Sequence, residues 1–255
     1  MSGAFSEHGY RTLLRAFFER GYETVGYEAA EPAAPHLILR HDLDMSLTAA
    51  EPIATVEAEL GLKAHYFVLL RTEMYNPFSP AARATFEQLR AQGHEIGLHL
   101  DASLYGNDAP ALEAAAAWEC RALEDAAGAP VRFVSFHRPA AALLGHARTV
   151  AGRRHTYEPR FFKEMGYCSD SRGGWHHGAP LDHPAVAEGR GLQLLTHPIW
   201  WAHSVAGDPV ATLDKFRAER DRVLARALAA NCDPYRAARG TAPPALNGHA
   251  GDEQG

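Results

Sequence analysis

The chain has 255 residues, of which 46 % are hydrophobic and 22 % charged, and its formal net charge is −6. This length and composition are typical of one globular domain with a sizeable core, and the negative charge argues against a nucleic-acid partner. No apolar run reaches the roughly 18 residues of a membrane span, and the first residues lack the apolar segment of a signal peptide. We therefore expect a cytoplasmic protein with no membrane partner.

The cysteines and histidines limit the kinds of site that the chain can form. Cys120, Cys168 and Cys232 are odd in number and far apart, which argues against a disulfide scaffold or a cysteine zinc site and fits a reducing compartment. Histidine occurs 15 times. Imidazole is therefore the first side chain to follow in a search for a site.

Apolar periodicity predicts strands and helices that alternate along the chain. In chain order they are a helix over 7–21, a strand over 36–40, a helix over 46–60, a strand over 63–70, a helix over 80–92, a strand over 94–100, a helix over 110–127, a strand over 131–136, a strand over 191–196 and a long helix from 209.

This alternation predicts an α/β fold with a parallel sheet and helices outside it. The first strand is followed by no G-x-G-x-x-G, so a distorted (β/α) barrel of seven or eight strands is favoured over a dinucleotide-binding sheet. Pro52 predicts a kink or a late start for the helix over 46–60, and the elements between 141 and 190 stay unassigned. We expect a single catalytic domain over 1–237 and a disordered tail over 238–255.

Carboxylates and imidazoles stand at the ends of four predicted strands, where the loops of a barrel converge into one active site. Asp42 and Asp44 follow the first strand, and because side chains alternate along a strand, both can face one pocket. Two carboxylates so close together repel each other unless a cation neutralises them. One would then be a metal ligand and the other free to act as a base. The alternative is that one of them caps the following helix.

The third strand, HEIGLH, ends in the next candidate ligand. Its two histidines are one residue too far apart for a zinc-binding helix, and on a strand they point to opposite faces. His99, at the end of the strand, is the better candidate, and His94 is interpreted as structural. Gly97 lies where a side chain would block a ligand. Asp101 is either a further oxygen ligand or an ordinary loop carboxylate.

The remaining strand ends supply further groups with alternative readings. His137 either completes a site with Asp44 and His99 that leaves positions open for water and substrate, as a catalytic metal ion requires, or is an ordinary loop histidine. Arg138 either pairs with Asp42 and holds it ionised or is a surface residue.

His197 is either a general acid, with Asp170 as its hydrogen-bond partner, or a histidine of the core; Asp170 can equally be a turn residue. Trp175, Trp200 and Trp201 form either a wall for a sugar ring or part of the core.

Five segments carry these residues along the chain: LRHDLD at 39–44, GHEIGLH at 93–99, Arg138-Pro139, Asp170 with Trp175, and Leu195-Thr196-His197. In this order, over about Leu37 to Trp201, they resemble the motifs of the polysaccharide-deacetylase superfamily (NodB homology, carbohydrate esterase family 4). The resemblance implies a barrel and a metal-dependent hydrolase. It makes Asp42 the base, Asp44 and His99 metal ligands, and Arg138, Asp170 and His197 parts of the catalytic machinery.

The chain departs from the family pattern in two places. The family's second histidine ligand would fall at Ser103, and serine is a poor replacement, so His137 is our choice for the third ligand. The segment between the first two motifs contains Tyr75 and Asn76, which either reach the substrate or pack within their loop.

The resemblance implies hydrolysis of a C–N bond other than a peptide bond: removal of an acetyl or formyl group from an amino sugar or a related small glycosylated metabolite. The partner would be a small-molecule or oligosaccharide substrate, and the cofactor a divalent metal, with Zn²⁺ as first choice and other ions as alternatives. Two other functions stay open, an amidase acting on a cyclic amide or ureide and a non-catalytic carbohydrate-binding barrel. The oligomeric state is not predicted.

Overall fold

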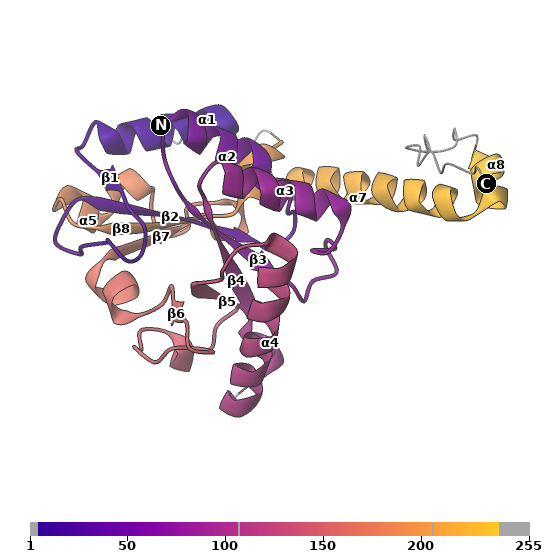
Figure 1. The fold of residues 1–255 in the computed structure, drawn as a ribbon. Helices are drawn as coiled ribbons and strands as arrows, with labels where there is room; N and C mark the ends of the chain where they lie inside the picture. Colours follow the sequence, from indigo (N-terminus) through magenta and orange to yellow (C-terminus); the bar gives the residue numbers. More distant parts are fainter. Residues whose placement is uncertain (1–4, 107, 206, 240–255) are drawn as a thin grey trace, which may run out of the picture. The chain divides into compact units, whose positions relative to one another are not determined.

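The computed structural model describes residues 5–106, 108–205 and 207–239. The strands are β1 (Glu23–Thr24), β2 (His36–Leu43), β3 (His65–Leu69), β4 (Glu95–Asp101), β5 (Phe133–His137), β6 (Arg154–His155), β7 (Gly166–Ser169) and β8 (Leu192–Thr196). The α-helices are α1 (Glu7–Phe18), α2 (Ala50–Glu59), α3 (Pro80–Ala91), α4 (Ala109–Ala127), α5 (Pro184–Ala187), α6 (Pro198–Ala202), α7 (Pro209–Asn231) and α8 (Asp233–Arg239). Figure 1 shows their arrangement.

The chain forms two compact units, Met1–Pro209 and Val210–Gly255. The first contains the whole sheet, and the described part of the second is most of α7 together with α8. The single domain over 1–237 stays a prediction, and the predicted tail lies outside the described residues from 240 onward. None of the helices that the structure describes combines the length and the apolar character needed to cross a membrane.

Local sequence signals explain where the helices begin and end. The Ser79 side chain caps α3 by accepting a hydrogen bond from the Ala82 N–H (3.1 Å), with Pro80 in the first turn. Helix α4 ends at Gly128, whose φ of 61° is the left-handed conformation that favours glycine. Helix α2 begins at Ala50, so Pro52 lies in its first turn. Of the two alternatives that Pro52 predicts, a kink or a late start, the structure has the late start.

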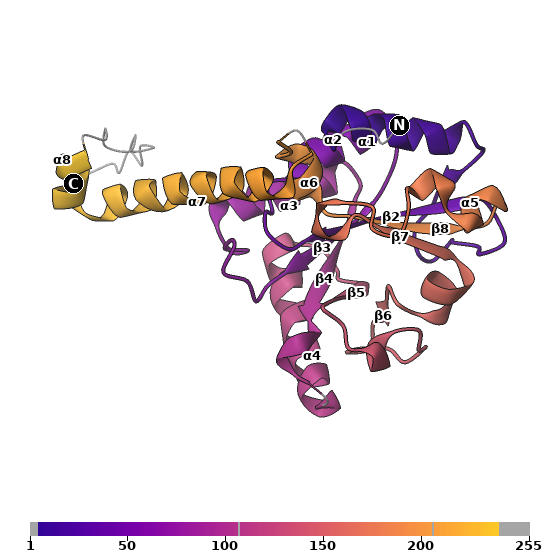
Figure 2. The ribbon, with the colours of Figure 1, turned by 180° about the vertical axis from the view of Figure 1, so that it is seen from behind.

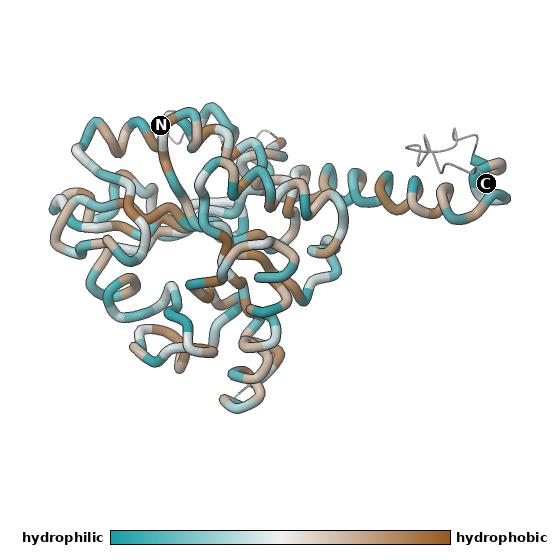
Figure 3. The backbone as a smooth tube through the Cα atoms, in the orientation of Figure 1, coloured by the Kyte–Doolittle hydropathy of each residue, from teal (hydrophilic) through white to brown (hydrophobic). Residues whose placement is uncertain are grey.

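All strand pairs of the sheet are parallel, in the order β6-β5-β4-β3-β2-β8-β7, with β1 paired to the beginning of β2. The predicted α/β fold with a parallel sheet of seven or eight strands is therefore confirmed. Within the described residues β6 and β7 do not pair with each other, so the barrel is open along that side. Figure 2 shows the same sheet from behind, and Figure 3 shows apolar residues along its strands.

Side-chain contacts across the interior show that the sheet is curled. Strands β3 and β4 lie between β2 and β5, which would separate β2 from β5 by about 14 Å in a flat sheet. Yet Arg40 Nη2 of β2 lies 2.5 Å from the Ser135 hydroxyl of β5, and Arg40 Nη1 lies 3.5 Å from the Gln193 side-chain oxygen of β8. The inward face of the sheet therefore encloses one interior, and Arg40 lies at its centre.

The outward face of β2 carries a second buried polar cluster beneath α1 and α2. The Glu57 carboxylate is fully buried and accepts hydrogen bonds from the hydroxyls of Tyr10 and Tyr66, both 2.6 Å. His41 Nε2 lies 2.7 Å from the same carboxylate, and its Nδ1 lies 2.7 Å from the Thr196 hydroxyl. Burial alone would raise the pKa of Glu57, but the neighbouring His41 outweighs this effect and lowers the pKa. The cluster joins α1, α2, β2, β3 and β8.

Gly97 is required by packing rather than by a ligand, which corrects the expectation from the sequence. A Cβ atom at this position would lie 2.5 Å from a ring carbon of Phe67 and 2.9 Å from the carbonyl oxygen of Phe133. Both neighbours belong to the apolar core of the barrel, and one of the two contacts is with backbone. The strands therefore cannot approach this closely around any larger residue.

Replacement of Gly97 by alanine should lower the free energy of unfolding by about 1–3 kcal/mol, the usual effect of overpacking a core. Urea unfolding would measure the difference. Gly174→Ala is the matched control, since the nearest atom to an added Cβ there lies at 3.5 Å and belongs to a side chain. Equal stability of the two variants would contradict the packing argument.

Two histidines are buried away from the site. Burial lowers the pKa of His65, in β3, to about 3, and burial together with His146 lowers the pKa of His155, in β6, to about 4. Both therefore stay neutral in the folded protein at pH values at which an unfolded chain protonates its histidines. Since the unfolded state then binds more protons, acid favours unfolding.

Between pH 6.5 and about 4, the free energy of unfolding should fall by up to about 1.4 kcal/mol per pH unit for each of these two histidines. Urea unfolding at several pH values, with a chelator present to remove any metal contribution, would measure the slope. The His65→Gln variant should reduce this slope by up to about 1.4 kcal/mol per pH unit, the contribution of one bound proton. An unchanged slope in that variant would show that His65 is protonated in the folded state as well.

Candidate metal and catalytic site

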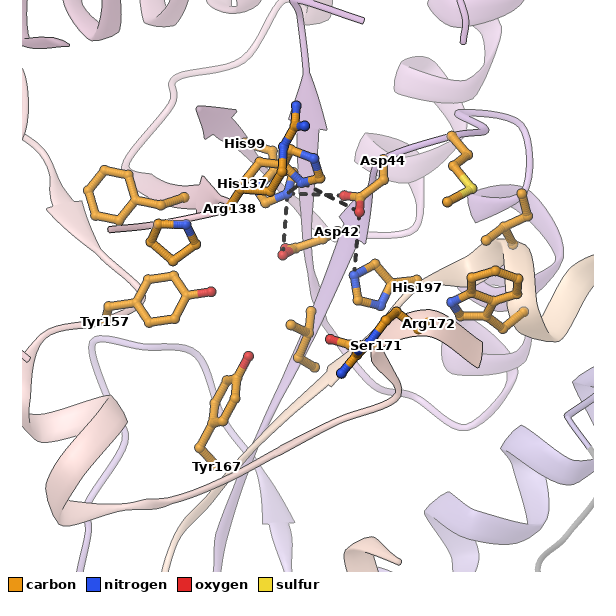
Figure 4. Close-up of a pocket in the computed structure, with 16 residues that line it drawn as sticks. Asp42, Asp44, His99, His137, Arg138, Tyr157, Tyr167, Ser171, Arg172 and His197 are labelled. Atoms are coloured by element: carbon orange, nitrogen blue, oxygen red, sulfur yellow. Dashed lines mark hydrogen bonds and ion pairs between the residues drawn. The ribbon is translucent and has the colours of Figure 1, made fainter. Parts of the chain in front are cut away.

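A pocket of about 350 Å³ opens at the carboxyl ends of β2, β4, β5 and β8 (Figure 4). It collects side chains that are far apart in the sequence, because parallel strands end at the same edge of the barrel. Its walls include Asp42, Asp44, His99, His137, Arg138, Tyr157, Tyr167, Ser171, Arg172, His197 and Trp200.

Asp44, His99 and His137 each offer a ligand atom, and these atoms all lie within 4.8 Å of one another. His99 Nε2 lies 3.0 Å from Asp44 Oδ1 and 3.2 Å from His137 Nδ1, while His137 Nδ1 lies 3.5 Å from Asp44 Oδ2. Two imidazoles and one carboxylate form a donor set that zinc and similar divalent ions accept. The structure thus brings together the three residues that the sequence predicts as ligands.

The electrostatics of these three residues also fit a cation. Asp44 Oδ1 is buried and faces His99 Nε2 at 3.0 Å, but it has no well-directed hydrogen bond from any described residue, as expected for an oxygen that would share a cation with that imidazole. Burial would raise the pKa of Asp44, but His197, His99 and His137 outweigh it, and the carboxylate stays ionised. Burial lowers the pKa of His137, which favours the neutral imidazole that binds metal.

Asp42 pairs with Arg40, and this corrects the expectation that its partner is Arg138. Arg40 Nε and Nη2 lie 3.0 and 2.7 Å from the two carboxylate oxygens, and the guanidinium is fully buried. Burial alone would raise the pKa of Asp42, but Arg40 outweighs it, with help from His99, so the pKa is lowered. His99 Nε2 lies 3.6 Å from Asp42 Oδ2, so the carboxylate is adjacent to the candidate ligand set.

Arg138 has a different partner. Its Nη2 lies 2.5 Å from Asp101 Oδ2, and its side chain is 64 % exposed. The other oxygen of Asp101 accepts hydrogen bonds from the backbone N–H (3.1 Å) and the hydroxyl (2.6 Å) of Ser103. Asp101 therefore holds the loop after β4 and is not among the residues that line the pocket. Ser103 is directed to Asp101, so it does not take the place of the missing histidine ligand.

His197 is held by Asp170 from the side opposite to the pocket. Asp170 Oδ1 lies 2.7 Å from His197 Nδ1, and both carboxylate oxygens accept the backbone N–H of His197, at 3.0 and 3.1 Å. Trp201 Nε1 donates to Asp170 Oδ2 at 2.7 Å. Burial would lower the pKa of His197, but Asp44 and Asp170 raise it to about 9. A protonated Nε2, 3.6 Å from Asp44 Oδ2, therefore faces the pocket.

The residues predicted to bind substrate divide into two groups. Trp200 lines the pocket. Tyr75 instead donates its hydroxyl to the Leu43 carbonyl (2.7 Å) and accepts from the Leu69 N–H (3.0 Å). The Asn76 side chain accepts the Phe78 N–H (3.0 Å) within its own loop, and Trp175 stacks on Phe5 at 5.9 Å. For Tyr75, Asn76 and Trp175 the packing alternatives describe the structure.

The sequence reasoning missed Arg40 and most of the pocket's far wall. The alternation that pairs Asp42 with Asp44 also places Arg40, two residues earlier, on the same face of β2, so this signal was present. Tyr157, Tyr167 and Arg172 fall in the segment that could not be assigned, and no periodic pattern there points to them.

Replacement of Arg40 by glutamine should lower the free energy of unfolding by about 3–5 kcal/mol, because it leaves the buried Asp42 carboxylate without its counter-charge. Arg138→Gln is the control and should change stability by no more than about 1 kcal/mol, since that side chain is largely exposed. Thermal or urea unfolding would compare them. Similar losses for the two variants would contradict the assignment of Arg40 as the partner of Asp42.

No family model matches the sequence, and no curated protein does. Among solved structures, the chain is similar to a family 4 carbohydrate esterase from Bacillus anthracis, with 14 % identity, a TM-score of 0.44 and coverage of 83 % of this chain and 86 % of that one. It is similar to a chitin deacetylase from Colletotrichum lindemuthianum, with 13 % identity, a TM-score of 0.45 and coverage of 74 % and 83 %. Identities and scores this low assign no activity to the chain.

Proposed function

We propose that the chain is a metal-dependent hydrolase that removes an acetyl or formyl group from the nitrogen of an amino sugar or a related small glycosylated metabolite. One observation carries the proposal: a carboxylate–imidazole–imidazole set lies in a pocket beside a separate carboxylate, Asp42, that is paired with Arg40 and a separate imidazole, His197, that is held by Asp170. Binding alone needs no such pair of proton-transfer groups, whereas hydrolysis of an amide needs both.

Asp44, His99 and His137 would hold the metal ion, which would polarise the amide carbonyl and the attacking water. We assign the general base to Asp42. Its carboxylate is ionised, it lines the pocket, and Arg40 fixes its orientation through two hydrogen bonds. Because the ion pair with Arg40 is buried, the carboxylate does not have to reorganise when it takes a proton from water.

We assign the general acid to His197. Asp170 binds its Nδ1, so the Nε2–H is the proton that can be given to the departing amine. Asp170 is itself fixed by Trp201 and by the backbone of His197, and it acts here as a positioning residue. The acid directly follows β8 and the base lies near the end of β2, and these two strands are neighbours in the sheet.

The sugar part of the substrate would contact the aromatic wall of the pocket. Tyr157, Tyr167 and Trp200 line it, and aromatic faces pack well against the apolar faces of sugar rings. Whether the acyl group is acetyl or formyl, and whether a cyclic amide is accepted instead, is decided by turnover of N-acetyl and N-formyl amino sugars beside cyclic ureides. We take Zn²⁺ as the first ion to supply, followed by other divalent ions.

Removal of the metal with a chelator should abolish turnover, and a divalent ion should restore it. Asp42→Asn should reduce kcat by about 10²- to 10⁴-fold, the range for loss of a general base. The same variant should keep the metal stoichiometry of the unchanged protein, measured by elemental analysis, because Asp42 is not one of the three ligands.

Asp125→Asn, on the exposed side of α4, is the matched control and should leave both readouts unchanged. Full activity in chelator would remove the metal from the reaction. A protein that binds no stoichiometric metal would favour a non-catalytic barrel instead.

A further inference from the structure

Arg172 is a cation of the pocket wall that has no counter-charge among the residues that the structure describes. It lines the pocket and is exposed, and it forms no ion pair or hydrogen bond with any residue in the described ranges. In Figure 4 it lies with Ser171 and His197 on the side of the pocket opposite to Tyr157. A charged side chain at this position is therefore free to meet whatever enters the pocket.

The other charged groups of the pocket satisfy one another. Arg40 pairs with Asp42, and Arg138 pairs with Asp101. Asp44 is shared among three imidazoles, and Asp170 is bound to His197. Arg172 thus adds an unmatched positive charge to a site whose other ionic groups are already paired.

The backbone holds Arg172 in an unusual conformation. Its φ of 62° and ψ of 25° lie in the left-handed region, which non-glycine residues rarely adopt. Three described non-glycine residues have a positive φ, and two of them, Arg138 and Arg172, are arginines of this pocket. Such conformations persist only where surrounding structure enforces them, and they gather at binding sites.

The loop around Arg172 supplies that enforcement. The Asp170 carbonyl accepts hydrogen bonds from the N–H groups of Gly173 (3.0 Å) and Gly174 (3.3 Å). On the other side the Ser171 N–H donates to the Ser169 hydroxyl at 3.2 Å. Asp170 is the residue that fixes His197, so the same loop positions Arg172 relative to the candidate general acid.

We propose that the substrate of this pocket is an anion, whose carboxylate or phosphate group binds the Arg172 guanidinium while its acyl-amide lies at Asp42 and His197. This deepens the proposed function and rests on it for the acyl-amide. The planar guanidinium can donate two parallel hydrogen bonds to either kind of anion. An acylated amino sugar that carries a carboxylate or a phosphate combines the required groups in one small molecule.

The test is a calorimetric titration of the metal-loaded full chain with three probes: N-acetylglucosamine, N-acetylglucosamine 1-phosphate and N-acetylmuramic acid. We expect one or both anionic sugars to bind more tightly than the neutral one, and the stronger of the two identifies phosphate or carboxylate. Arg172→Asn should weaken binding of the preferred anion by about 10- to 100-fold, the range for hydrogen bonds to a charged group. It should leave binding of the neutral sugar unchanged.

The variants at Arg172 are chosen so that a loss of binding does not come from a misfolded loop. Asparagine tolerates the left-handed backbone, so Arg172→Asn removes the charge without new strain. Arg172→Lys keeps the charge but loses the paired donors and should recover part of the affinity. Arg83→Asn, on the exposed face of α3, is the matched control for loss of an arginine elsewhere.

Two results would overturn the inference: equal affinity for the neutral and anionic sugars, or an anion preference that Arg172→Asn leaves intact, which would mean that the anion binds the metal ion instead. Turnover of the same probes is a separate readout. An Arg172-dependent anion preference without deacylation of these probes or of their N-formyl counterparts would contradict the proposed function but not the anion site. Deacylation of the probes without a preference for the anionic sugars would support the proposed function and contradict the anion site at Arg172.

Discussion

The buried pair of Arg40 and Asp42 is the interaction on which the rest of the structure depends. A guanidinium with no exposed surface is unfavourable unless nearly all of its donors are used. Here the donors meet Asp42, the hydroxyls of Ser135 and Tyr157, and the side-chain oxygen of Gln193, while the guanidinium carbon lies 4.7 Å from the centre of the Tyr157 ring. These partners come from several strands and loops. They can meet only if the sheet curls in the observed register, so one interaction links the closure of the barrel to the orientation of the candidate base.

Strand β2 is fixed from both of its faces. Arg40 and Asp42 point inward, and His41 between them points outward to Glu57 and Thr196. The alternation of a strand thus puts two separate polar networks on either side of the segment that ends in Asp44. Sites that must hold charged groups in fixed positions work best on elements that cannot shift, and a strand anchored on two faces meets that condition.

Most of the fold and the centre of the site could be predicted from the sequence, because both follow from short-range periodicity. The strands around Asp42, His99, His137 and His197 are short apolar runs with polar ends, and parallel topology then brings those ends together. The roles of these residues remain predictions. The partner of Asp42 was predictable only in part. The alternation of β2 places Arg40 on the same face as Asp42, but whether Arg138, which follows β5, also reaches Asp42 depends on how the barrel curls. Strand β7 was not predicted, because its four residues, GYCS, are short of a recognisable apolar run and only alternate ones are buried.

The Glu57 cluster gives the first helix of the chain a part in supporting the site. The hydroxyl of Tyr10, in α1, donates a hydrogen bond to the Glu57 carboxylate, which also contacts the imidazole of His41, next to Asp42. If the chain were trimmed past this helix, a buried acid would lose one of its donors, and the effect would reach the strand that carries the candidate base. Helix α1 therefore does more than cover the sheet: its Tyr10 supports the strand that carries the candidate base.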